Sequence, residues 1–140
     1  MIIQTITLKS VYAQSIAANL FMDGGPLFMS LILICLIVSL IFIIVGFINT
    51  KKSVATSRKM TKLTIDSSIL GLVLGFLGSV IGLISAFDSI EAFGNPSPEM
   101  FAGGLKVSLL TATFGLFQFV IARIGILVLR LMLPPEDISE

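Results

Sequence analysis

Residues 71–87 read GLVLGFLGSVIGLISAF and carry no charged side chain. The run without charge extends from Ser67 to Phe87. A helix needs about 20 predominantly apolar residues to cross the hydrocarbon core of a bilayer. The stretch is therefore predicted to be a transmembrane helix.

Small residues recur along this stretch, at Gly71, Gly75, Ser79 and Gly82, with Gly78 beside them. Small residues at a spacing of three or four let membrane helices approach closely, because lipid gives apolar helices no reason to associate. The stripe is explained either by packing within the chain or by packing against other copies. We favour other copies, and hence a homo-oligomer, since three helices leave much of the stripe uncovered.

The composition agrees with a membrane protein. Of 140 residues, 56% are hydrophobic and only 12% are charged, against about 25% charged in soluble domains. The net charge of +1 gives no footprint for nucleic acid. We find no nucleophile–base pair, metal-ligand cluster or phosphate loop, so we expect no enzyme, no cofactor and no metal site.

Reading outward from 67–87 divides the chain into one all-α membrane domain, 1–140. Three spans are predicted at 26–48, 67–87 and 101–133. An interfacial amphipathic helix and a turn occupy 1–25. The connections are a cytoplasmic loop at 49–66 and an external turn at 88–100, and the chain ends in a tail at 134–140.

Charge sets the orientation. Five Lys and Arg residues and no acid lie between 49 and 62, whereas Asp88, Glu91 and Glu99 lie in the 88–100 turn. Arg123 and Arg130 lie near the end of the third span. Short basic loops stay on the cytoplasmic side. The N-terminus is predicted outside and the C-terminus inside.

Polar residues recur at depth in the third span. Thr111, Gly115 and Gln118 share one face by their i, i+4, i+7 spacing, with Ser108 one turn earlier and Thr113 roughly opposite. A single Ser or Thr often bonds only its own helix. Several together favour a bundle interior or a water-filled cavity. No Asp, Glu or Lys lies at mid-depth, so a conducting protein would need a carboxylate from a partner.

Two motifs carry a family resemblance. LGFLGSVIGLISAF, 74–87, resembles the second-helix signature of the MotA/TolQ/ExbB proton-channel family, approximately LGLLGTVxGxxxAF. GGLKVSLLTATFGL, 103–116, resembles the third-helix signature, approximately GGISEALxTTAxGL. The order of the motifs and the predicted topology also agree. The basic loop is far shorter than is usual in the family.

The resemblance implies a function. Family members form a pentamer around two single-span subunits of the ExbD, TolR or MotB type, whose membrane Asp carries the ion and drives rotation. Carried over by position, the second-helix Thr becomes Ser79, the third-helix Thr pair becomes Thr111 and Ala112, and the family Glu falls on Val107. The resemblance implies an ion pathway lined by hydroxyl and amide groups: Ser79, Ser108, Thr111, Thr113 and Gln118. Helix packing and oligomerisation are assigned to Gly71, Gly75, Gly78, Gly82 and Gly115.

Several alternatives stay open. The favoured function is an ion-channel subunit of a rotary motor; the others are a non-conducting scaffold of the same fold and a passive holin-like pore. Proton or sodium, the process energised, and whether Thr113 replaces the hydroxyl missing at Ala112 are left undecided.

Overall fold

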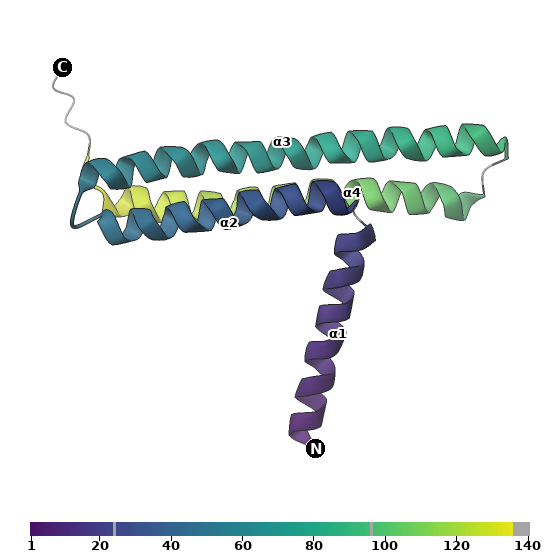
Figure 1. Ribbon diagram of the computed structural model, residues 1–140, viewed down its shortest axis with the longest axis horizontal. Coiled ribbons are helices and arrows are strands. Elements are labelled where there is room, and N and C mark those ends of the chain that lie inside the picture. Colours follow the sequence, from purple (N-terminus) through teal and green to yellow (C-terminus); the bar gives the residue numbers. More distant parts are fainter. Residues whose placement is uncertain (24, 96, 136–140) are drawn as a thin grey trace.

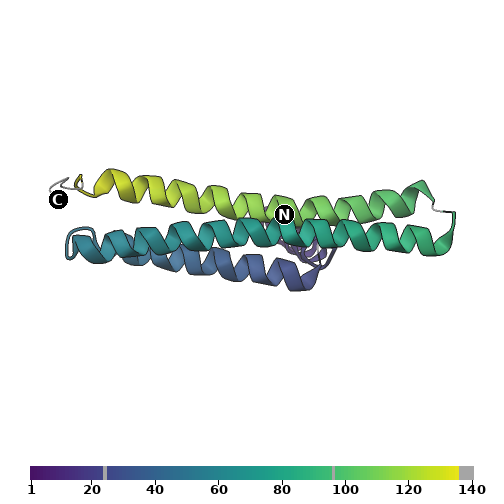
Figure 2. The same ribbon diagram turned by 90° about the horizontal axis from the view of Figure 1, so that it is seen from above.

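The computed structural model describes residues 1–23, 25–95 and 97–135, without the side chains of 17–23. Four helices follow one another: α1 (Ile2–Asp23), α2 (Pro26–Asn49), α3 (Val54–Phe93) and α4 (Pro98–Met132). α2, α3 and α4 lie side by side as an antiparallel bundle, and α1 leaves the bundle where α2 begins (Figures 1 and 2). The described part of the chain is all-α, as predicted.

Three of these helices, α2, α3 and α4, are long and apolar enough to cross a membrane. At 1.5 Å per residue α2 is about 36 Å long, enough for a hydrocarbon core of about 30 Å. The longer α3 and α4 measure about 60 and 52 Å by the same rise. As predicted, three helices of the described chain are therefore capable of spanning a membrane.

The connections are shorter than the sequence suggested. Residues 54–66, expected to lie in a loop, form the start of α3, so only Thr50–Ser53 connect α2 to α3. The Ser53 side chain accepts from the backbone N–H of Thr56 at 3.5 Å and caps the helix. No Gly or Pro interrupts 54–70. Charge in this segment marks where the apolar stretch ends, but it does not end a helix.

The other end differs in the same way. α3 continues through 88–93 and ends at Gly94, which adopts a left-handed φ of 72°. α4 begins at Pro98, with Ser97 as its cap. The expected external turn at 88–100 therefore contracts to a few residues around the helix ends.

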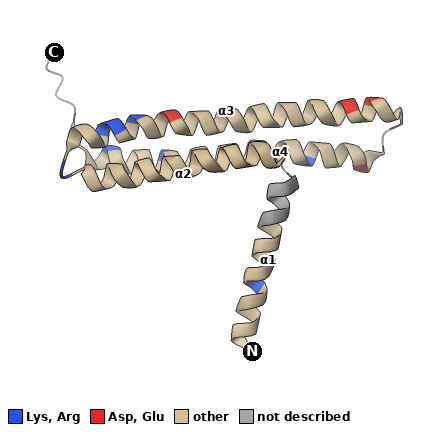
Figure 3. Cartoon of the chain, in the orientation of Figure 1, with Lys and Arg blue, Asp and Glu red and all other residues tan. Residues whose placement is uncertain are grey.

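The bundle is polar inside. Eight of its buried residues are polar and only seven are apolar side chains, while Leu, Ile, Val and Phe are exposed along all three helices. In lipid, polar side chains turn toward the bundle interior. Charges gather at the two ends, basic where α3 begins and α4 ends, acidic at the opposite tip (Figure 3). Asp66 and Lys106 are the exceptions to this separation.

Contacts fix the height of α2 in the bundle. At its end, the Ser57 hydroxyl donates to the Gly46 carbonyl at 2.9 Å. At its start, Phe28 lies against Gly78. α3 and α4 therefore run on as a pair beyond the start of α2 (Figure 1), where the rings of Phe87 and Phe101 lie 5.8 Å apart.

Candidate functional site

α3 and α4 meet along a seam that contains glycines from both helices. Gly75 and Gly115 face each other, and a Cβ added to Gly75 would lie 2.7 Å from the Cα of Gly115. No side chain fits between backbones at this separation, so only glycine permits it. Other α3 and α4 residues meet in the same antiparallel register on both sides of this point: Gly71 with Gln118, Gly78 with Thr111, Gly82 with Ser108 and Ala86 with Gly104.

This seam changes the interpretation of the small-residue stripe. Gly71 and Gly75 are buried against α4 of the same chain, and Gly78 is buried against α4 and Phe28 of α2. Gly82 lies beside Ser108 and is partly exposed. The expectation that three helices leave much of the stripe uncovered was wrong for Gly71, Gly75 and Gly78, because α4 offers Gly115 and small hydroxyl side chains opposite them. These three glycines are used within the fold, and the homo-oligomer stays a prediction.

The polar face of α4 lies in the seam. Ser108, Thr111 and Gln118 are 1%, 2% and 1% exposed. The Ser108 hydroxyl donates to the Gly104 carbonyl and that of Thr111 to the Val107 carbonyl, each at 3.1 Å. Bonds of this kind, to the carbonyl four residues earlier, are common for Ser and Thr in membrane helices. These three side chains share one face, as predicted, and that face meets α3.

Gln118 joins all three helices. Its Nε2 donates to the Ser39 hydroxyl of α2 at 3.4 Å, and Ser39 shares a 2.7 Å hydrogen bond with Ser67 of α3. The Gln118 amide rests directly on Gly71. Its Oε1 is buried and has no hydrogen-bond partner among the described residues. Ser39 and Ser67 were missed from the sequence; the only signal was a serine in the middle of the apolar 26–48 run.

Ser79 lies at the edge of the seam that faces away from α2. The Ser67 hydroxyl shares a hydrogen bond with Ser39 and so marks the side of α3 that faces α2. At 100° per residue, Ser79 points about 120° away from Ser67 around α3. Ser79 is partly buried. Gly125 contacts Ile43 and so marks the side of α4 that faces α2. At 100° per residue Ala112 points about 140° away from Gly125, which places Ala112 on the edge of α4 that faces away from α2. We call this the open edge of the seam.

Ser79 and Ala112 also share a height. Gly78 contacts Thr111 across the seam. Ser79 follows Gly78 along α3, and Ala112 follows Thr111 along α4. Because α3 and α4 are antiparallel, these two steps run in opposite directions, and the heights of Ser79 and Ala112 differ by about two residue rises, about 3 Å, less than one helix turn. The position where the family signature carries a second Thr is therefore beside Ser79, and here it holds a methyl group.

Thr113 lies elsewhere. It is about 100° further around α4 than Ala112 and is exposed. Its hydroxyl donates to the Leu109 carbonyl at 2.7 Å. Within the chain, Thr113 does not reach the open edge where the missing hydroxyl would be.

Arg123 lies in α4 between the hydroxyl-bearing stretch and the C-terminal end of the helix. Its guanidinium carbon lies 4.7 Å from the centre of the Phe119 ring, a cation–π distance. The Nε atom is buried and has no hydrogen-bond partner among the described residues. Between Arg123 and Lys106, α4 has no charge, and neither does α3 between Asp66 and Asp88.

The polar side chains of the seam limit which ions it can bind or conduct. Within the described residues, no three His, Cys, Asp or Glu side chains gather in a group that could hold a metal ion. Hydroxyls and one amide can solvate an ion, but they cannot carry a proton as a carboxylate does. The seam can therefore line a pathway without supplying its ionisable group.

Fold and seam together define a multi-pass membrane protein with a polar, glycine-packed pair of long helices. The sequence profile of the MotA/TolQ/ExbB proton channel family matches residues 52–131, which cover almost all of α3 and α4. The chain belongs to this family. Comparison with curated proteins and with solved structures found no match.

Proposed function

We propose that the chain is the channel-forming subunit of an ion-driven rotary motor in the bacterial inner membrane. In this proposal five copies form a ring around two copies of an ExbD/TolR/MotB-like single-span partner. The N-terminus is periplasmic and the C-terminus cytoplasmic. Ion flow, of protons or sodium, turns one component against the other.

One observation carries the proposal: a family of ion channels matches the two helices whose charge-free stretch has hydroxyls but no carboxylate. Ionisable groups within the membrane mark proton relays and ion pathways. In a chain that lacks one, the group has to come from a second protein. The proposal therefore assigns the membrane Asp to the partner.

The open edge is the part of the seam we assign to the pathway. Ser79 is partly accessible there, whereas Ser108, Thr111 and Gln118 are enclosed between helices. A partner helix can reach Ser79 without separating α3 from α4. We assign to the enclosed residues a supporting role, as the polar lining behind that edge.

The orientation rests on the charge separation seen along the bundle (Figure 3), since basic segments stay cytoplasmic. α1 leaves the bundle at the start of α2, which is the end of α2 away from the basic connection to α3 (Figure 1). This fits a helix lying at the outer interface. Its apolar side chains are not confined to one face, because Ile6 and Val11 point about 140° apart. Lipid contact on more than one side follows from that distribution.

A non-conducting scaffold of the same fold is the second candidate. The methyl group of Ala112 at the height of Ser79, and the bonding of Ser108 and Thr111 to their own helix, favour it. The two candidates share a ring but differ in ion flux.

The experiment begins with native mass spectrometry of the protein co-expressed with its genomic neighbours. Five copies with two copies of an Asp-bearing single-span chain are expected. A ring without such a partner would contradict the motor. The double variant Ser79→Ala, Thr111→Val should then abolish ion-driven work while leaving the ring intact; retained work would make these hydroxyls packing residues.

A further inference from the structure

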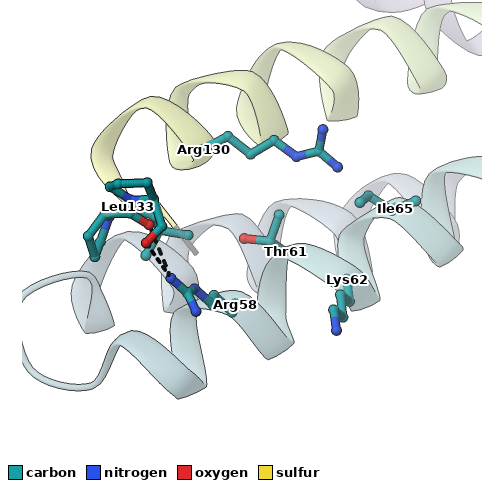
Figure 4. A pocket seen from close by; sticks show the side chains of 8 residues that line it. Arg58, Thr61, Lys62, Ile65, Arg130 and Leu133 are labelled. Carbon is teal, nitrogen blue, oxygen red and sulfur yellow. Dashed lines mark hydrogen bonds between the residues drawn. The ribbon is translucent and has the colours of Figure 1, made fainter. Parts of the chain in front are cut away.

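A pocket of about 330 Å³ opens between the start of α3 and the end of α4 (Figure 4). Arg58 and Lys62 line it from α3 and Arg130 from α4. All charged side chains in its lining are positive. Ile65 and Leu133 add an apolar wall. Neither the family match nor the ion pathway assigns a role to this pocket.

Arg58 is held in place by the fold. One Arg58 guanidinium nitrogen, Nη2, donates to the carbonyls of Pro134 and Pro135 at 3.1 and 3.5 Å, tying α3 to the chain beyond α4. Thr61, also in the lining, donates to the Ser57 carbonyl at 2.9 Å. Neither Lys62 nor Arg130 forms an ion pair with an acid of the described chain. Like charges brought together this way favour an anion between them.

The pocket is on the same side of the bundle as the open edge. Lys62 points about 140° away from Ser57 around α3, and Arg130 about 140° away from Gly125 around α4, at 100° per residue. Ser57 and Gly125 both contact α2 at this end. α2 therefore does not cover the pocket.

The height of the pocket is that of lipid headgroups. Leu129, next to Arg130, packs on Gly46 of α2. At that same height α2 exposes Ile44 and Ile48, 57% and 58% accessible. Exposed isoleucines indicate membrane at this level, while lysine and arginine indicate its polar boundary. A pocket with positive charges and an apolar wall at this boundary is complementary to a phospholipid, which joins a phosphate group to acyl chains.

We infer that this pocket binds the phosphate of an anionic phospholipid. Basic pockets between transmembrane helices at the cytoplasmic side suit such headgroups. The cations take the phosphate, and Ile65 and Leu133 contact the first part of the acyl chains. This inference does not depend on ion conduction, so it can hold or fail independently of the proposed function.

The test uses the full-length protein in phosphatidylcholine nanodiscs that contain a minority of phosphatidylglycerol. Native mass spectrometry measures the enrichment of retained phosphatidylglycerol. The double variant Lys62→Gln, Arg130→Gln should lower this enrichment about 30-fold, at about five-fold for each charge near the membrane surface. The charge-conserving variant Lys62→Arg, Arg130→Lys should keep it, which separates lost charge from lost fold.

The matched control removes two exposed charges outside the pocket, Lys51→Gln and Lys52→Gln. A smaller loss than in the pocket variant supports the inference, whereas an equal loss would reduce it to general surface attraction and overturn it. Displacement of the lipid by inorganic phosphate alone would assign the pocket to free phosphate. If wild type retains no phosphatidylglycerol until Glu136, Asp137 and Glu140 are neutralised, the chain's own acidic tail is the occupant and the lipid proposal fails.

Discussion

The enclosed centre of the seam and its open edge both carry hydroxyl residues, but these residues have different environments. Thr111 and Ser79 are both hydroxyl residues in charge-free runs, and the family resemblance assigns both to threonine positions of its signatures. Thr111 is enclosed between α3 and α4, whereas Ser79 lies partly exposed at the edge away from α2. The difference teaches that depth in the membrane does not by itself make a hydroxyl available to an ion; the side of the helix decides it.

The largest effect is expected at the centre of the seam. Gly75→Leu places a side chain where a Cβ alone would lie 2.7 Å from Gly115, so the helices must separate. We expect a loss of about 3 kcal/mol or more in unfolding free energy, at the upper end for overpacked sites. Titration of the detergent-solubilised protein with SDS, followed by circular dichroism, measures it.

Gly103→Leu is the control for that substitution. A Cβ at Gly103 meets no atom within 4 Å, so its stability should stay within about 1 kcal/mol, the intrinsic helix preference of the new residue. Equal stability of the two variants would mean that the seam is not tightly closed.

Ser79→Ala tests the open edge. We expect ion flux, measured in vesicles with the assembled complex, to fall about ten-fold or more, since a hydrogen bond to a charged group is worth about 1.5–3 kcal/mol. Thr111→Val should cost less flux, because its hydroxyl bonds the Val107 carbonyl. Ser30→Ala, in α2, serves as the matched control: its hydroxyl bonds the Leu27 carbonyl. A larger loss for Thr111→Val would reverse the comparison between centre and edge.

Ala112→Thr sharpens the comparison by adding a hydroxyl at the height of Ser79. Flux should rise a few-fold, as expected for one further hydrogen bond of about 1 kcal/mol. Ala112→Val has nearly the same shape and no hydroxyl. If the valine variant raises flux equally, side-chain volume and not polarity is responsible.

The smallest effect is expected at the node that joins α2 to the seam. Ser39→Ala removes the partner of Gln118 and of Ser67. Hydrogen bonds between membrane helices average about 0.6 kcal/mol, and the unfolding free energy should fall by about that amount. A loss above about 2 kcal/mol would exceed the known range of such bonds and make the node a main determinant of the fold.

Sequence reasoning located the spans because twenty apolar residues without charge leave few alternatives. It also placed Ser108, Thr111 and Gln118 on one face, since helix spacing alone decides which residues share a side. It misplaced the ends of α3, because a basic helix and a basic loop have the same charge. It missed the bond between Ser39 and Ser67, which are 28 positions apart along the chain.

By itself the sequence determined that this is a membrane protein of three long helices, with a family signature in two of them and no carboxylate at depth. Those properties depend on composition and local periodicity. Only the tertiary structure decided what covers the glycine stripe, which hydroxyls are enclosed, and that Ser79 and Ala112 share an edge. Each of these depends on how far one helix slides and turns against another, and that register is set by contacts such as Gly75 on Gly115, which no single helix contains.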